Sequence, residues 1–304
     1  MNEDSFVPAP RAPRFSGRVL LLKLLRLLLL ILLGTSVLVA IAMPDYVRAQ
    51  AWASPTSPAE WLLFQPFELS AEEWERGPHA EHGLFFASAD GTMLHGAWFP
   101  AADPQGVVVF AHGNAGHLQH RIYRAELLRD RFQLSVLLFD YRGYGLSEGT
   151  ATVEGALADT RAAQAQAAEL AQTTPDQVIL MGRSLGGALV AEVAAESTPR
   201  AVVIESSFRS LQEICRVHFP RMTWLVSAHK LNATAALQNY HGPLLLSHGD
   251  ADHTIPFSHG QALFQAAAGP KTFVRIPGGD HNDMQSEDYW EEFGRFLAGL
   301  SAAK

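Results

Sequence analysis

The segment ILMGRSLGGALVAEVAA, residues 179–195, joins an apolar run to a helix-like pattern of small residues. Ser184 lies at the junction, with Gly182 two positions before it and Gly186 two positions after it. A serine that caps a helix needs no such glycines, whereas a sharp strand-to-helix turn excludes side chains at both positions. The segment therefore predicts a turn that exposes the Ser184 hydroxyl above a sheet, at the positive end of a helix.

Short apolar runs alternate with helical patterns on both sides of this turn. The runs that predict strands lie at 107–112, 134–140, 177–182, 201–206, 243–249 and 272–278, and a hairpin is expected at 83–99. The patterns that predict helices lie at 117–130, 153–172, 185–197, 257–268 and 286–300. Such alternation is typical of an α/β fold, in which a mostly parallel sheet has helices on both faces.

Residues 207–242 break this alternation and are expected to form a small helical lid insertion. Their aromatic side chains include Phe208, Phe219 and Trp224. These aromatics either line an apolar pocket or form the insertion's own core, and we favour the core.

A serine hydroxyl is a weak nucleophile at neutral pH and needs a neighbouring base. His281 lies in the loop PGGDHND (277–283), after the last predicted strand. The preceding strand is followed by HGDADHTIP (248–256), which contains Asp250 and Asp252. In a sheet of this kind, the acid precedes the histidine along the chain and both follow strand ends. The pattern predicts His281 as the base and one of the two aspartates as its partner.

An oxyanion formed at Ser184 needs backbone donors. The N–H of Leu185, at the start of the expected helix, is one candidate. The N–H of Asn114, in the loop AHGNAGH (111–117), is the second; its side chain could instead only shape the turn. His112, His117 and His120 lie in or near this loop, but no HExxH motif or paired carboxylates accompany them, so no metal is expected.

The bulk composition narrows the classes of partner. The net charge is −8 and no basic cluster follows the N-terminal segment, which argues against nucleic acid as a ligand. Cys215 is the single cysteine, so the chain cannot form an internal disulfide.

The N-terminal segment predicts a membrane anchor. Residues 1–17 are expected to be a cytoplasmic tail and residues 18–43 a transmembrane signal-anchor helix, because Leu27–Met43 carries no charge. Basic residues precede this run, so the N-terminus is expected in the cytoplasm and the catalytic domain on the opposite, periplasmic or extracytoplasmic, side. The competing interpretation is a signal peptide cleaved after Ala40-Ile41-Ala42. Residues 44–80 are expected to be a linker and residues 81–304 the catalytic domain.

Six segments carry a resemblance to a known family. They are HGNAG (112–116), DYRGYGLSEG (140–149), GRSLGG (182–187), ESSFRSL (205–211), HGDADHTIP (248–256) and GGDHND (278–283). In this order they resemble the α/β-hydrolase superfamily, and more narrowly its short-lid, often membrane-anchored serine hydrolases, which include relatives of protein depalmitoylases. The resemblance implies a catalytic triad of Ser184, Asp252 and His281, with the Asn114 and Leu185 amides as the oxyanion hole.

The residues and the resemblance together predict a serine hydrolase that cleaves a carboxylic ester or thioester through an acyl-enzyme. No cofactor is expected, because nucleophile, base and oxyanion donors are all protein groups. The expected partner is a small-molecule or acylated substrate. A serine peptidase or amidase, and a membrane-anchored scaffold with a vestigial site, are the alternatives.

Overall fold

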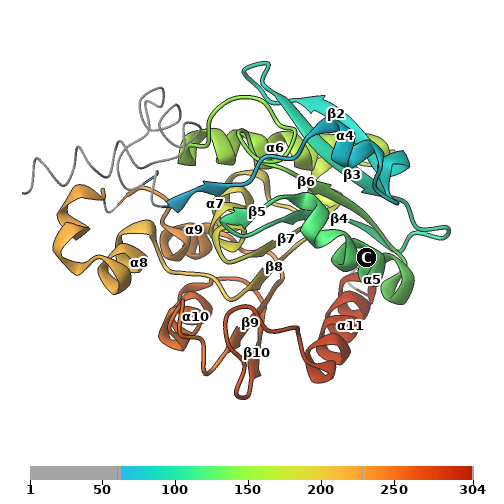
Figure 1. Cartoon of the computed structure of the whole chain (residues 1–304). Coiled ribbons are helices and arrows are strands. Elements are labelled where there is room, and N and C mark those ends of the chain that lie inside the picture. The colour runs from blue at the N-terminus through green and yellow to red at the C-terminus, as the bar shows by residue number, and fades with distance from the viewer. Residues whose placement is uncertain (1–59, 61–62, 228, 303–304) are drawn as a thin grey trace, which may run out of the picture. The chain divides into compact units, whose positions relative to one another are not determined.

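The computed structural model describes residue 60 and residues 63–227 and 229–302. Within these residues, eight strands form one sheet in the order β10-β9-β8-β7-β4-β6-β3-β2 (Figure 1). Their bounds are β2 Gly83–Ala87, β3 Met93–Phe99, β4 Gly106–Ala111, β6 Leu134–Phe139, β7 Val178–Arg183, β8 Ala201–Glu205, β9 Leu244–Gly249 and β10 Lys271–Ile276. Among the eight described strands, β3 alone runs in the opposite direction to the others, so the expected mostly parallel sheet is confirmed.

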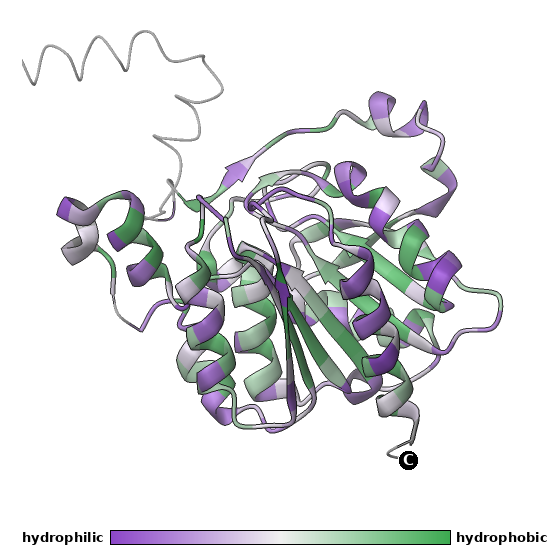
Figure 2. Cartoon of the chain, turned by 90° about the horizontal axis from the view of Figure 1, so that it is seen from below, coloured by the Kyte–Doolittle hydropathy of each residue, from purple (hydrophilic) through white to green (hydrophobic). Residues whose placement is uncertain are grey.

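Helices cover both faces of this sheet. The helices are α5 Ile122–Phe132, α6 Val153–Leu170, α7 Leu185–Ser197, α9 Ala233–Asn239, α10 Phe257–Ala266 and α11 Glu287–Ala302. Along β4, Val107 and Val109 pack with α6 and α7, whereas Val108 and Phe110 pack with α5 and α11. The strand is apolar at successive positions because both of its faces are buried. Figure 2 shows the resulting apolar sheet between helices whose outer sides are polar.

A segment before the sheet also packs on this domain. The short strand β1 (Gln65–Pro66) pairs with β5 (Ala115–Gly116), and helix α4 (Ala71–Glu75) follows it. The side chains of Phe64, Leu69 and Trp74 are buried. Residues 63–75, within the stretch expected to be a linker, therefore belong to the packed domain.

The insertion between β8 and β9 contains α8 (Leu211–His218), a 3₁₀-helix (Pro220–Leu225) and α9. Helix α9 packs against α7, and Phe208 is buried. Phe219 is 42% exposed and Trp224 is 80% exposed, so the expectation that all three aromatics form a core is wrong. The 3₁₀-helix presents Trp224 outward, where its indole N–H donates to the Arg221 carbonyl.

The expected transmembrane segment and the cytoplasmic tail lie outside the described residues. Among the helices that the structure does describe, none combines the length and the apolar character needed to cross a bilayer.

Candidate active site

The turn between β7 and α7 holds Ser184 in a strained conformation. Its φ is 55° and its ψ is −119°, a region that favours glycine and is costly for other residues. A Cβ at Gly182 would lie 2.3 Å from the Gly186 carbonyl oxygen, and one at Gly186 would lie 2.0 Å from the Ala111 carbonyl oxygen. Only glycines allow these elements to cross so closely. The Ser184 side chain makes no capping hydrogen bond, so helix capping does not explain this serine.

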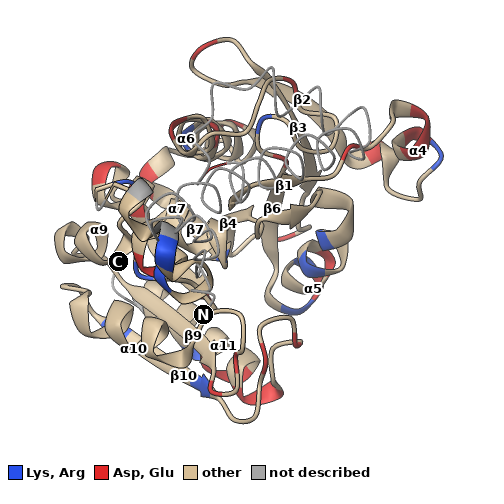
Figure 3. Ribbon diagram, turned by 60° about the vertical axis from the view of Figure 1, so that its left-hand side comes forward, with Lys and Arg blue, Asp and Glu red and all other residues tan. Residues whose placement is uncertain are grey.

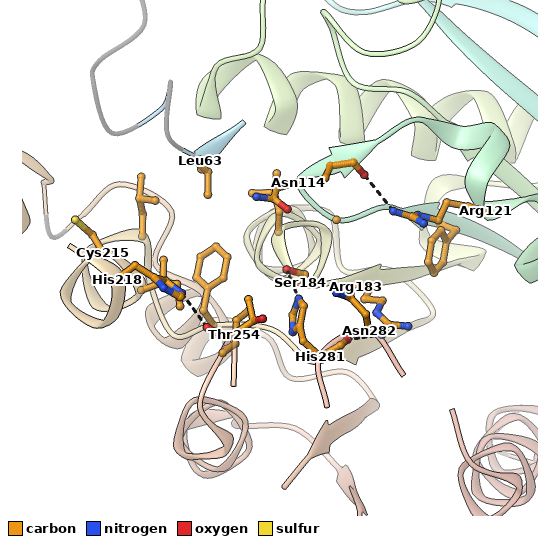
Figure 4. A pocket seen from close by; sticks show the side chains of 18 of the residues that line it. Leu63, Asn114, Arg121, Arg183, Ser184, Cys215, His218, Thr254, His281 and Asn282 are labelled. Atoms are coloured by element: carbon orange, nitrogen blue, oxygen red, sulfur yellow. Dashed lines mark hydrogen bonds between the residues drawn. The ribbon is translucent and has the colours of Figure 1, made fainter. Parts of the chain in front are cut away.

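Three side chains from three loops form a hydrogen-bonded chain beside this turn. His281 Nε2 lies 3.2 Å from Ser184 Oγ, and His281 Nδ1 lies 2.8 Å from Asp252 Oδ2. All three side chains are buried, with the contact between Ser184 and His281 drawn in Figure 4. The loops follow β7, β9 and β10, whose carboxyl ends lie at the same edge of the sheet with β8 between β7 and β9, and this brings the three side chains together.

Asp252 is held as an ionised carboxylate. Its Oδ1 accepts hydrogen bonds from the N–H groups of Thr254 at 2.9 Å and Ile255 at 2.7 Å. Burial alone raises the pKa of Asp252, but hydrogen bonds from His248, His281 and the Ile255 N–H hold it well below its usual value. An ionised Asp252 orients the His281 ring and favours a proton on its Nδ1, which leaves Nε2 free to accept one.

Asp250, the other candidate acid, is engaged elsewhere. Its Oδ2 accepts from Arg275 Nε at 2.6 Å and its Oδ1 accepts from the Gly278 N–H at 2.6 Å. The Arg275 guanidinium lowers the pKa of Asp250. The structure brings Asp252, and not Asp250, to His281.

The two expected oxyanion donors both line the pocket above Ser184. Leu185 is the first residue of α7, where backbone N–H groups have no intrahelical acceptor. The Asn114 N–H shares a peptide unit with the Gly113 carbonyl, whose oxygen lies 2.6 Å from His112 Nδ1. Because the C=O and N–H of a trans peptide point in opposite directions, the His112 ring fixes the direction of the Asn114 N–H.

Side chains of the motif DYRGYG (140–145) donate hydrogen bonds to the loop that carries Asn114. The Tyr141 hydroxyl donates to the His112 carbonyl at 2.8 Å, and the Tyr144 hydroxyl donates to the Asn114 carbonyl at 2.7 Å. Asp140 Oδ1 lies 3.4 Å from His112 Nε2. The sequence motif was visible, but its role emerges only when the fold places it against residues 112–114.

A second buried network lies beneath the serine and was not predicted. The Ser184 N–H donates to the Glu205 carbonyl oxygen at 2.9 Å. The Glu205 carboxylate accepts two hydrogen bonds of 3.2 Å from Arg124 and one of 2.7 Å from Tyr289. The sequence signal for this network is Glu205, which directly follows the apolar residues 201–204 in AVVIES (201–206). A charged side chain at the end of a buried strand requires a partner.

A pocket of about 520 Å³ lies over Ser184 and His281. Its volume lies within the range of about 300–1,000 Å³ that is usual for small-molecule sites. In Figure 4, Leu63, Cys215 and His218 lie on one side of Ser184, and Arg121 and Arg183 lie on the other.

The histidines in and near the candidate oxyanion loop (residues 111–117) do not gather with other described side chains into a group of metal ligands. The rings of His117 and His120 lie with their centroids 4.1 Å apart. Burial lowers the pKa of both, and that of His117 is lowered further by His120. Across the described residues, no group of three or more His, Cys, Asp or Glu side chains is placed to hold a metal ion.

Comparison with known proteins identifies the family to which this fold belongs. Residues 108–236 match the sequence profile of the alpha/beta hydrolase family. The protein YfhR of Escherichia coli is 33% identical over 230 residues, which cover 71% of this chain and 78% of YfhR. This chain belongs to the alpha/beta hydrolase family. The Mycobacterium tuberculosis protein Rv2307c is 36% identical over 205 residues, covering 66% of this chain and 72% of Rv2307c.

Solved structures of other proteins share the fold. Est1E from Butyrivibrio proteoclasticus, determined with ferulic acid bound, has a TM-score of 0.59 at 21% identity and covers 72% of this chain and 99% of its own. Acetyl xylan esterase 1 from Thermoanaerobacterium has a TM-score of 0.57 at 19% identity, covering 72% of this chain and 82% of its own. At these identities the likeness establishes the alpha/beta hydrolase fold.

Proposed function

We propose that this protein is a serine hydrolase that cleaves a carboxylic ester or thioester through an acyl-enzyme intermediate. The observation that supports it most strongly is the chain of contacts from Ser184 through His281 to Asp252 at a pocket. Membership of a hydrolase family and the esterases among its structural neighbours support the same chemistry.

In this mechanism, Ser184 Oγ attacks the carbonyl carbon while His281 Nε2 takes its proton. Asp252 stabilises the imidazolium, and the Asn114 and Leu185 N–H groups stabilise the oxyanion. Collapse of the tetrahedral intermediate breaks the bond to the leaving oxygen or sulfur, which receives the proton from His281. Water then attacks the acyl-enzyme with His281 again as the base, releasing the acid and restoring Ser184.

Labelling by a fluorophosphonate probe, combined with hydrolysis of p-nitrophenyl esters and S-acyl thioesters, tests this mechanism. The resemblance to relatives of depalmitoylases makes long-chain S-acyl peptides the first thioesters to assay. We expect Ser184→Ala to abolish labelling. Asp252→Asn should lower kcat by about 10⁴-fold, because the imidazole then adopts the wrong tautomer.

Asp250→Asn is the matched control, because Asp250 contacts Arg275 and not His281. Its kcat should stay close to that of the wild type. A folded wild-type protein that the probe does not label would overturn the active serine and favour the vestigial scaffold. Cleavage of peptide amides without cleavage of esters or thioesters would replace the proposal with a serine peptidase.

We also propose that the charge-free segment Leu27–Met43 anchors the protein with the N-terminus in the cytoplasm and the hydrolase domain on the periplasmic or extracytoplasmic side. Its apolar character and the basic residues before it support this topology. The full chain should stay with membranes in alkaline carbonate, and external protease should reach the hydrolase domain in spheroplasts. A shortened, carbonate-soluble product would instead indicate a cleaved signal peptide.

A further inference from the structure

Within the described residues, three arginines line the pocket, and one of them is neutralised. Arg124 binds the Glu205 carboxylate through two hydrogen bonds. Arg121 and Arg183 form no ion pair with any carboxylate in the part of the chain that the structure describes. No direct ion pair therefore neutralises either guanidinium, although the Asp140 charge favours the protonated form of Arg121.

Both of these guanidinium groups are held by carbonyl oxygens. Arg121 donates to the Ala115 carbonyl at 3.1 Å. Arg183 donates to the carbonyl oxygens of His281 and, at 3.1 Å, of Asp283. These contacts fix the direction of the two side chains and leave their positive charges available to a ligand.

The two cations lie close enough to interact unfavourably. Burial lowers the pKa of Arg121, and the charges of Arg183 and Arg124 lower it further, against opposing effects of Tyr123 and Asp140. An arginine nonetheless stays protonated at neutral pH, so both charges persist. The chain as a whole carries a net charge of −8, and Figure 3 shows acidic and basic residues interspersed over its helices. A bound anion would relieve the repulsion within this local positive site.

The opposite wall of the pocket is mostly apolar, and His218, the ionisable side chain on that side, has its Nε2 2.8 Å from the Thr254 carbonyl oxygen. This wall comes from α8, from the residues flanking it and from the segment before β1. Its side chains are Leu63, Phe208, Leu211, Ile214, Cys215 and Phe219. Because Ser184 lies between this wall and the two arginines in Figure 4, a bound molecule would need one apolar end and one anionic end.

We propose that the substrate is an ester or thioester of an apolar acyl chain with an alcohol or thiol that carries a phosphate or carboxylate. The acyl chain lies against α8, and Arg121 and Arg183 bind the anionic group. This inference rests on the proposed function and adds the substrate class to it.

The orientation follows from the position of Arg183. Its guanidinium donates to the carbonyl of His281, the residue whose imidazole must protonate the leaving group. An anion bound there belongs to the departing alcohol or thiol and not to the acyl chain. The bond from the acyl carbon to that oxygen or sulfur breaks, His281 supplies its proton, and the anionic alcohol or thiol leaves.

Three octanoyl esters with the same acyl chain test the inference with the full-length protein in detergent. They are 1-octanoylglycerol 3-phosphate, the neutral 1-octanoylglycerol, and the cationic octanoylcholine. We expect kcat/KM for the phosphate ester to exceed that for the neutral ester by about 10- to 100-fold, as charge-assisted hydrogen bonds allow. Octanoylcholine should be the poorest substrate because its charge faces the arginines.

Substitution of the arginines should remove this preference. In Arg121→Gln and in Arg183→Gln, the ratio of kcat/KM for the phosphate ester to that for the neutral ester should fall toward one. The control is Arg295→Gln, an exposed arginine of α11 that pairs with Glu292, and it should keep the wild-type ratio. Circular dichroism and melting temperature establish that each variant is folded. Arg183 directly precedes Ser184, so Arg121→Gln is the variant that tests the anion site without altering the turn at Ser184.

Other outcomes separate this inference from the proposed function. If the wild type cleaves the neutral and phosphate esters equally well, or if Arg121→Gln keeps the full preference, the anion site is overturned while the serine hydrolase stands. A preference for mono-octyl suberate, with its carboxylate on the acyl part, over octyl octanoate would overturn the orientation. A folded protein that cleaves no ester and is not labelled at Ser184 would overturn both proposals.

Discussion

Gly186 fixes how closely α7 can approach β4. A Cβ at this position would lie 2.0 Å from the Ala111 carbonyl oxygen, and that oxygen belongs to a buried central strand that has no room to shift. Ala111 also directly precedes the loop that carries the Asn114 N–H. One missing side chain therefore sets the distance between Ser184 and the loop that carries the Asn114 N–H.

We predict that Gly186→Ala destabilises the fold by about 1–3 kcal/mol, as is usual for overpacked sites. It should also lower kcat by more than the melting temperature alone would explain, because the oxyanion loop must move. Thermal melts and ester hydrolysis at a temperature where the variant is folded measure the two effects.

The matched control for this change is Gly299→Ala. Gly299 is exposed on helix α11, and a Cβ there would meet no atom within 4 Å. It should leave kcat unchanged and raise stability by up to about 1 kcal/mol, because alanine is the better helix former. If both variants behaved alike, the close approach at Gly186 would not be what positions the loop.

Among the helices and strands, the sequence predicted those that repeat a pattern over many residues. The buried strands and the helices from 107 to 300 lie close to their expected positions because their apolar residues recur at a clear period. The two-residue strands β1 and β5 are too short to have a period. Helix α4 had a recognisable signal, since Ser70 and Glu73 form a capping box.

The contacts between elements were less accessible from the sequence. The order of the parallel strands, and with it the meeting of the loops after β7, β9 and β10, follows a general rule for such sheets. The rule brings Ser184, Asp252 and His281 to one edge. No comparable rule places Tyr144 against the oxyanion loop, or Arg124 against Glu205, because those pairs depend on how particular side chains pack.

The Tyr144 hydroxyl joins two elements at the site. It donates to the Asn114 carbonyl and accepts from the Gln65 N–H, so it ties β1 to the oxyanion loop. We predict that Tyr144→Phe lowers kcat by about tenfold, less than the loss of an oxyanion donor itself, while KM changes little. Steady-state kinetics on a neutral ester separates the two parameters.

Tyr240→Phe controls for the loss of a buried hydroxyl. Tyr240 is equally buried and its hydroxyl donates to the Pro243 carbonyl at 3.2 Å, away from the pocket. Both substitutions should cost about 1 kcal/mol of stability. Only the change at Tyr144 should alter kcat, and an equal effect of both on kcat would refute a positioning role.

At the scale of the whole molecule, folding buries His259 in surroundings that disfavour its protonation. His259, on α10, is 5% exposed, and its Nδ1 accepts a hydrogen bond from the Arg209 N–H at 3.3 Å. Burial, the Arg209 charge and the nearby His248 lower the pKa of His259 to about 4. The charges of Glu213 and Asp252 oppose this shift and have smaller effects. An unfolded chain binds a proton at this histidine near pH 6.5.

Between about pH 6.5 and pH 4, the unfolded state therefore binds more protons at His259 than the folded state does. The stability that neutral His259 contributes is complete above pH 6.5 and is lost as the pH falls toward 4. After allowance for the solvent that reaches the ring, the loss between pH 7 and pH 5 is about 1 kcal/mol. For a domain of this size that corresponds to about 2–4 °C in Tm.

We predict that His259→Asn flattens this dependence, because the amide oxygen can accept the Arg209 N–H without binding a proton. The difference between the Tm at pH 7 and the Tm at pH 5 should shrink by about 2–4 °C relative to the wild type. His241→Asn, which replaces an exposed histidine, should keep the wild-type difference because that side chain is hydrated in both states. Equal pH dependence in His259→Asn and the wild type would show that protonation of other groups governs the acid sensitivity of the fold.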